Sequence, residues 1–208
     1  MNFKEYSLSK DGEKKVTENI KVKELRCKDG TDYIKIDYVV VCLAQYIRDI
    51  FKSPFNINSA YRTKAYNARP DVGGTSGSKH LMSCAIDGYI KNVSPQLIGN
   101  ILYSMGLKRI GVYSNFIHFD TDTKPVWLSK GNFIKIQVPY LNRLLKKGDS
   151  NYLVTIIQYK LNLMGYNCGV EDGIFGNKTL IALKNFQSKN LLIADGIVGI
   201  KTWNKMFN

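Results

Sequence analysis

The ten residues 78–87, Ser-Lys-His-Leu-Met-Ser-Cys-Ala-Ile-Asp, contain one of the two histidines of this 208-residue chain. The other histidine stands in 115–120, Asn-Phe-Ile-His-Phe-Asp, so an aspartate closely follows each histidine. Both stretches alternate in the way that strands do, since successive side chains of a strand point to opposite faces. Asp87 would then lie on the polar face of one strand, and His118 and Asp120 on the polar face of another. Apolar residues would fill a core on one side, and polar residues would line a cleft on the other.

His80, Asp87 and His118 together could hold one metal ion. Zinc takes nitrogen and carboxylate ligands, and a catalytic site supplies three of them from the protein. From spacing alone, two ordinary polar histidines are the simpler interpretation. A further alternative pairs His80 with Cys84, four residues apart, if that turn were helical. The preceding glycine and serine and the strand-like run after it argue against a helix there.

The composition describes a globular protein with a core of useful size, since 44% of the residues are hydrophobic. No apolar run reaches the length of a transmembrane helix, so we expect no membrane insertion. The charged N-terminus lacks the apolar stretch of a secretory signal, so we expect synthesis in the cytoplasm. Four dispersed cysteines are then expected to be reduced, buried thiols: Cys27, Cys42, Cys84 and Cys168.

The net charge of +13 calls for a polyanionic partner. Nucleic acid is the usual candidate for such a charge. The lysines are dispersed, however, with no RNA-binding motif and no basic run longer than Lys146-Lys147. We therefore expect no nucleic-acid partner, and an anionic polymer such as a bacterial cell wall accounts for the charge equally well.

The C-terminal third contains a repeat. The pattern Asp-Gly-Ile-x-Gly-x-Lys-Thr occurs at 172–179 and again at 195–202. Asp-Gly favours a tight turn because glycine tolerates positive φ, and the threonine would start an apolar helix after each turn. Helical spacing of apolar residues over 153–164, closed by Gly165, indicates a further helix upstream. The sequence thus predicts a three-helix module over 142–208.

This module resembles the peptidoglycan-binding domain found in many bacterial and phage wall hydrolases. The residues that carry the resemblance are Lys147-Gly148-Asp149-Ser150, Gln158, Leu161, Gly165-Tyr166, Asp172–Gly176, Thr179, Ala182, Phe186-Gln187, Asp195-Gly196, Gly199 and Thr202-Trp203. The resemblance implies that bacterial peptidoglycan is the partner.

The first 122 residues predict an α+β fold. Helical spacing runs over 39–51, and a second helix is expected over 95–105, capped by Ser94 and closed by Gly106. Short strand-like runs lie at 55–61, 84–90, 110–113 and 116–120, which favours an antiparallel sheet. We therefore divide the chain into a first domain (1–124), a partly packed linker (125–141) and the helical domain (142–208).

The first domain resembles the M15 family of zinc peptidases. The matching residues are Asn58–Thr63, Asn67, Gly73-Gly74, Ser78, His80, Asp87, Gly111–Tyr113, Phe116, His118 and Asp120. The resemblance implies the fold shared by D-Ala-D-Ala peptidases and the hedgehog domain, a small antiparallel sheet with flanking helices. It implies one Zn²⁺ held by His80, Asp87 and His118. Arg62, Ser78 and Tyr113 would contact the substrate, and Arg62 would either hold a substrate carboxylate or polarise the scissile carbonyl.

Two positions depart from the family pattern. Ser83 stands where glycine is common, which matters only if the backbone there needs positive φ. Asn115 stands where many relatives have an acidic residue three positions before the last histidine. An amide cannot accept a proton, so Asp120 is the alternative general base. Asp120 could equally be a structural carboxylate, and the sequence leaves both open.

The expected protein is a monomeric, zinc-dependent peptidase that hydrolyses peptide bonds of peptidoglycan, with a wall-binding module. It would resemble a phage endolysin, act on the wall after release from the cytoplasm, and be either an endopeptidase or a D,D-carboxypeptidase. The alternative is a non-catalytic wall-binding protein on a peptidase fold, which Asn115 favours. The sequence does not say which bond is cut.

Overall fold

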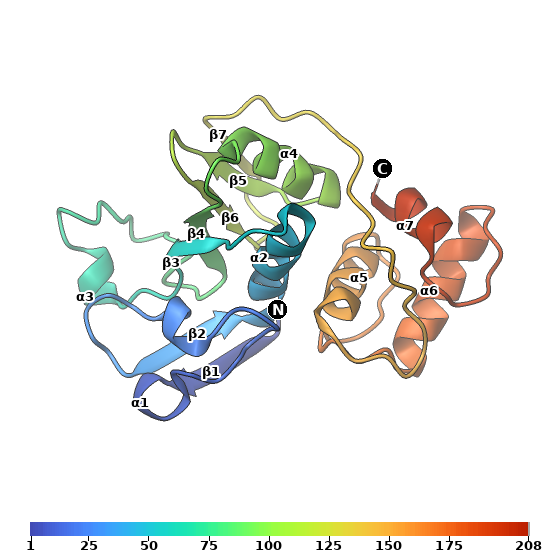
Figure 1. Ribbon diagram of the computed structural model, residues 1–208, viewed down its shortest axis with the longest axis horizontal. Coiled ribbons are helices and arrows are strands. Elements are labelled where there is room, and N and C mark those ends of the chain that lie inside the picture. The colour runs from blue at the N-terminus through green and yellow to red at the C-terminus, as the bar shows by residue number, and fades with distance from the viewer. Residues whose placement is uncertain (208) are drawn as a thin grey trace.

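The computed structural model describes residues 1–207, and Figure 1 shows the arrangement of its elements. The strands are β1 (Phe3–Ser7), β2 (Tyr33–Asp37), β3 (Asn56–Ser59), β4 (Ala85–Tyr89), β5 (Arg109–Val112), β6 (Ile117–Asp120) and β7 (Trp127–Ser129). The helices are α1 (Leu8–Asp11), the 3-10 helix η1 (Val22–Leu25), α2 (Tyr38–Phe51), α3 (Lys64–Asn67), α4 (Pro95–Met105), α5 (Tyr152–Leu163), α6 (Asn177–Lys189) and α7 (Ile200–Phe207).

A five-stranded sheet forms the centre of the first part, in the order β3-β4-β6-β5-β7. Neighbouring strands are antiparallel except β5 and β7, which are parallel. Ile86, Ile110 and Phe119 alternate with the polar residues of their strands and are fully buried. Helices α2 and α4 contact the sheet. The α+β class predicted from the sequence is confirmed, with one apolar face in the core and one face free for polar side chains.

The two long helices of this part begin and end where their sequences predict. Asp37 caps α2 by accepting the N–H of Val39. Pro95 opens α4, and Gly106 ends it with a φ of 100°, a conformation that glycine adopts at low cost. The buried carboxylate of Asp37 also accepts Thr121 Oγ at 2.6 Å and thereby ties the start of α2 to the end of β6.

The N-terminal two-stranded sheet of β1 and β2 was not predicted. The two strands pair antiparallel as a separate sheet. Ile34 and Ile36 of β2 are fully buried, while β1 is largely exposed. A polar, half-exposed strand such as β1 carries little apolar alternation, which explains why the pattern in its sequence is weak.

Three helices, α5, α6 and α7, form the C-terminal part (Figure 1). Each copy of the repeated motif is a turn held by one buried glutamine. Gln158 donates to Asp172 Oδ1 (2.9 Å), to the Ile174 carbonyl (3.1 Å) and to Thr179 Oγ (3.1 Å). Its own amide oxygen accepts the N–H of Gly173 at 2.9 Å.

Gln187 repeats this arrangement 29 positions later in the chain, on the second copy of the motif. Its amide group contacts Asp195 Oδ1 (2.8 Å), the Ile197 carbonyl (3.0 Å), Thr202 Oγ (3.2 Å) and the Gly196 N–H (2.9 Å). The threonines do not start the helices as we expected: α6 begins at Asn177 and α7 at Ile200. The threonine of each motif instead lies in the first turn of its helix, where its hydroxyl oxygen accepts a hydrogen bond from the glutamine side-chain amide.

Helix α5 of the C-terminal part packs on α2 of the first part, and the buried residues of both parts form one apolar cluster. Tyr152 of α5 hydrogen-bonds Asp49 of α2. Trp203 of α7 donates its indole N–H to the carbonyl of Val138 at 3.1 Å. Strand β7 lies inside the range 125–141 that we expected to be a linker, so that range contributes to the sheet. The limits of the domains stay a prediction.

Across residues 1–207, no helix combines the length and the apolar character needed to cross a membrane. All four cysteines are buried and free of disulfides, as expected.

Candidate metal centre

The register of the sheet brings Asp87 and His118 face to face. The two residues are direct partners in the antiparallel pair of β4 and β6. Side chains that are directly opposite in such a pair lie on the same face with close Cβ atoms. On either side of them in the same row lie Ser59 of β3 and Gly111 of β5. The predicted polar face therefore exists, and its centre is this pair.

His80 comes from the loop before β4 rather than from the sheet. The residue is 3% exposed, and its Nδ1 lies 2.7 Å from the carbonyl oxygen of Ala60. Residues 80–83 form turns and Cys84 lies outside any helix, so the alternative pairing of His80 with Cys84 at helical spacing is wrong. The Ala60 contact fixes the ring so that its other nitrogen, Nε2, points at the sheet.

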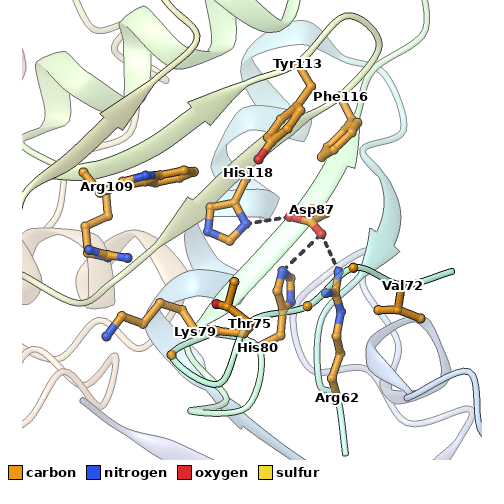
Figure 2. Close-up of a pocket in the computed structure, with 15 residues that line it drawn as sticks. Arg62, Val72, Thr75, Lys79, His80, Asp87, Arg109, Tyr113, Phe116 and His118 are labelled. Carbon is orange, nitrogen blue, oxygen red and sulfur yellow. Dashed lines mark hydrogen bonds and ion pairs between the residues drawn. The ribbon is translucent and has the colours of Figure 1, made fainter. Parts of the chain in front are cut away.

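The three predicted ligands converge on one point (Figure 2). His80 Nε2 lies 3.1 Å from Asp87 Oδ2, and His118 Nδ1 lies 2.6 Å from Asp87 Oδ1. One ligand atom from each residue can be chosen so that all three lie within 4.8 Å of one another. The sequence placed these residues in three separate segments, and the fold assembles them.

The outward nitrogen of His118 also has a partner. Its Nε2 lies 3.4 Å from Oδ2 of Asp120, the next residue on the same face of β6. Asp120 has no exposed surface, and both of its oxygens accept Arg109 Nε, at 3.0 and 2.9 Å. Asp120 therefore stands behind His118, away from the open side of the cluster. Arg109, its partner on β5, was missed in the sequence because only the strand register reveals it.

The surroundings stabilise positive charge at the centre of the cluster. Burial alone would raise the pKa of Asp87, but hydrogen bonds with His118 and His80 outweigh it and hold this pKa well below its usual range. Burial would lower the pKa of His118, but Asp120 and Asp87 raise it to about 9. An imidazole between two carboxylates occupies a place where the protein favours a cation.

The cluster opens into a cavity of about 500 Å³. The residues that line it are Arg62, Val72, Gly73, Gly74, Thr75, Gly77, Ser78, Lys79, His80, Asp87, Arg109, Tyr113, Phe116, His118 and Trp127. All predicted substrate contacts, Arg62, Ser78 and Tyr113, are among them. Arg62 lies 2.9 Å from Asp87 Oδ2 and 2.7 Å from Ser59 Oγ, so its guanidinium borders the cluster.

The two departures from the family pattern have different consequences. Ser83 has a φ of 60°, so the position does require the left-handed region, and serine adopts it at a cost of about 1 kcal/mol. Asn115 lies exposed at the tip of the β5–β6 hairpin and is not among the described residues that line the cavity. Asp87 is the one acidic residue in that lining.

The cluster fits a metal ion such as zinc. Two imidazoles and one carboxylate are a ligand set that zinc uses in open catalytic sites. Metal-binding histidines almost always place their second ring nitrogen against a carbonyl or carboxylate. Both histidines do so here, against Ala60 and Asp120.

Comparison with known protein families agrees with this geometry. A family model for peptidase M15 matches residues 15–120, which is half of the chain, and a model for a peptidoglycan binding domain matches residues 150–206. The chain belongs to the peptidase M15 family, with a peptidoglycan-binding domain in its C-terminal part.

Individual relatives match shorter stretches. A spore cortex-lytic enzyme of Bacillus cereus is 40% identical over 63 residues, which cover 30% of this chain and 24% of that protein. The crystal structure of the SleB N-terminal domain is 37% identical and covers 33% of this chain and 93% of that one, with a TM-score of 0.32. The endolysin of Burkholderia phage AP3 is 36% identical over 31% of this chain and 24% of that one, with a TM-score of 0.30. This chain thus spans about a quarter of the length of the cortex-lytic enzyme that it matches.

Proposed function

We propose that this protein is a zinc-dependent peptidase that hydrolyses peptide bonds of bacterial peptidoglycan and is held at the wall by its C-terminal domain. The observation that carries the proposal is the convergence of His80, Asp87 and His118 at an open cavity, with both outer histidine nitrogens already satisfied. Membership of the M15 family and the match to a peptidoglycan binding domain support the substrate class.

His80 Nε2, His118 Nδ1 and the carboxylate of Asp87 would hold the ion. When bound, zinc supplies a Lewis acid that polarises a peptide carbonyl and makes water more acidic. Arg62 lies beside Asp87 at the border of the cavity, where its guanidinium would bind a substrate carboxylate or the carbonyl oxygen as negative charge develops.

Tyr113 would act as a neutral hydrogen-bond donor. Its hydroxyl points toward the cluster in Figure 2. Burial, together with the nearby charge of Asp87, raises the pKa of this phenol, so it keeps its proton at neutral pH. A preorganised O–H group aimed at the developing oxyanion stabilises a transition state without reorganisation.

Asp120 is assigned to the orientation of His118 rather than to proton transfer. The carboxylate is fully buried, and both of its oxygens accept a hydrogen bond from Arg109 Nε. A general base must reach the proton that it removes, directly or through one water. The same lack of a free carboxylate in the cavity lining favours the second candidate, a wall-binding protein without hydrolytic activity.

Purified bacterial cell walls distinguish the two candidates. Turbidity is followed with the full chain after zinc loading, after chelation, and after zinc is restored, and released fragments are analysed by mass spectrometry. The proposal predicts zinc-dependent clearing and new peptide termini, whose identity names the bond. Sedimentation with the walls without any new termini, in the presence of zinc, would overturn the peptidase and leave a binding protein.

A further inference from the structure

Trp127 lines the cavity although it lies beyond residue 120, where the match to the peptidase family ends. It begins β7, which pairs parallel with β5 in the register Arg109 to Trp127 and Gly111 to Ser129. One row across the sheet therefore runs from Ala85 through Asp120 and Arg109 to Trp127. The segment that leads to the wall-binding domain thus completes the polar face of the sheet.

The indole contacts the two groups that surround Asp120. Its ring stands edge-on to His118, with centroids 5.4 Å apart and planes at 87°. The guanidinium carbon of Arg109 lies 5.8 Å from the centroid of the same ring. Such edge-to-face and cation–π contacts are attractive and restrict the orientation of both partners.

Gly111 makes this placement possible. It lies between His118 and the β7 strand in the sheet, on the same face. A Cβ atom at this position would come within 2.6 Å and 2.9 Å of two carbons of the Trp127 ring. The indole can therefore lie across β5 and reach His118 because residue 111 has no side chain.

The backbone before Trp127 is fixed by groups next to the metal cluster. Arg109 donates to the carbonyl of Pro125 at 2.5 Å. Lys79, the neighbour of His80, pairs with Asp122 at 2.5 Å, and both side chains are mostly buried. Asp122 also donates its N–H to Asp120 at 3.0 Å. Residues 122–127 are thus held against the site at three points.

We infer that Trp127 is a positioning residue of this site: its ring fixes the His118 imidazole and the Arg109 guanidinium, and forms one wall of the cavity. The inference rests on the proposed function for its effect on hydrolysis, but its effect on metal binding is independent of it. Because the indole acts through His118, its loss should loosen a ligand without removing any ligand.

The test uses four variants of the full chain: Trp127→Leu, Trp127→Phe, Gly111→Ala and, as a control, Leu128→Ala. Leu128 is the next residue of β7, partly exposed and on the other face of the strand. Co²⁺ affinity is measured from the visible absorption of the bound ion, wall clearing gives the maximal rate and the half-saturating wall concentration, and circular dichroism checks the fold.

Trp127→Leu and Gly111→Ala are expected to weaken Co²⁺ binding about tenfold, as the loss of an outer contact to a ligand does. The maximal rate of clearing should fall more than the half-saturating wall concentration changes. Trp127→Phe, which keeps an aromatic edge, should restore most of both, and Leu128→Ala should match the wild type.

Wild-type Co²⁺ affinity in folded Trp127→Leu and Gly111→Ala would overturn the inference. If the wild type binds Co²⁺ but clears no wall, the proposed function fails, and the Co²⁺ affinities of the variants still decide the role of Trp127. If Trp127→Leu does not fold, the Co²⁺ affinity of Gly111→Ala decides the inference, because a Cβ at residue 111 displaces the Trp127 ring.

Discussion

The C-terminal domain and the metal cluster of the first part both bury polar side chains, but the partners of these side chains differ. In the C-terminal domain, Gln158 and Gln187 each make four hydrogen bonds to one turn, and each is almost fully buried. In the first part, His80, Asp87 and His118 are also largely buried, but their facing atoms are directed at one another and at a cavity. Buried polar groups that satisfy backbone hold a fold together, whereas groups that converge beside open space form a site.

Charge sharpens the contrast. In the glutamine turns the buried group is a neutral amide, and burying it costs little because all of its hydrogen bonds are made. The cluster places His118 between the carboxylates of Asp87 and Asp120, and the pKa of this histidine is raised to about 9. The metal cluster is therefore expected to depend on a bound cation, and the glutamine turns on their hydrogen bonds.

The largest expected effect is at the centre of the cluster. Asp87→Asn removes one ligand and its charge, so the isolated variant should contain no zinc, and wall clearing should fall about 10³-fold or more. Metal content is measured by mass spectrometry of the dialysed protein and clearing by turbidity. Glu5→Gln, which removes one exposed charge on β1, is the control and should behave as the wild type. A zinc content of one ion in folded Asp87→Asn would contradict the assigned ligand set.

The sequence predicted these two regions to different depths. The repeat at 172–179 and 195–202 revealed both turns, because each is built from residues adjacent in the chain together with one glutamine. Strand alternation placed Asp87, His118 and Asp120 on polar faces. It could not show that Asp87 lies opposite His118, because register is a property of two strands and not of either sequence.

The parts that were missed share a cause. Arg109 and Trp127 enter the site only through the pairing of β5 with β6 and β7. β7 has three residues, too few for an alternating pattern to be recognised, and its sequence contains an aromatic residue that also suits a packed linker. Strand β1, at the edge of the two-stranded sheet, lacks an apolar face. Short strands at the edges of sheets are therefore where sequence reasoning failed here.

The second largest effect is expected in the glutamine turns. Gln158→Leu or Gln187→Leu leaves a glycine N–H and a threonine hydroxyl without the buried amide, at a cost of about 3 kcal/mol in the free energy of unfolding. Urea unfolding followed by the intrinsic fluorescence of the chain, to which Trp203 of α7 contributes, measures this loss. Gln137→Leu, at an exposed position, is the control. Zinc content should be unchanged in both turn variants, and a loss of zinc would show that the two regions are not independent.

A smaller effect is expected for Asp120→Asn, which separates the two roles considered for this residue. If Asp120 orients His118, its amide variant should bind zinc about 10–100-fold more weakly. A general base would leave zinc affinity unchanged and abolish only the rate of clearing. Competition with a chromogenic chelator measures the affinity, and clearing is measured at saturating zinc. Asn115→Ala, at the exposed tip of the hairpin, should change neither quantity.

The smallest effect is expected at Lys160 of α5, where the C-terminal domain contacts α4 of the first part. Its ammonium group donates to the carbonyl of Met105 at the end of α4 at 3.0 Å, and it lies over the ring of Phe207. Burial, with repulsion from Lys135, lowers the pKa of Lys160 to about 8 from an ordinary value of 10.5. Between these two pH values the unfolded chain binds more protons than the folded one, so this residue makes stability rise with pH.

Lys160→Met keeps the apolar stem and removes the charge, and should raise the free energy of unfolding by about 1 kcal/mol at pH 7, since the lost hydrogen bond offsets part of the gain. This advantage over the wild type should shrink as the pH increases from 8 to 10.5, which urea unfolding at pH 7, 9 and 10 would reveal. A constant difference across that range would show that the Lys160 ammonium is not desolvated at the contact between the two regions.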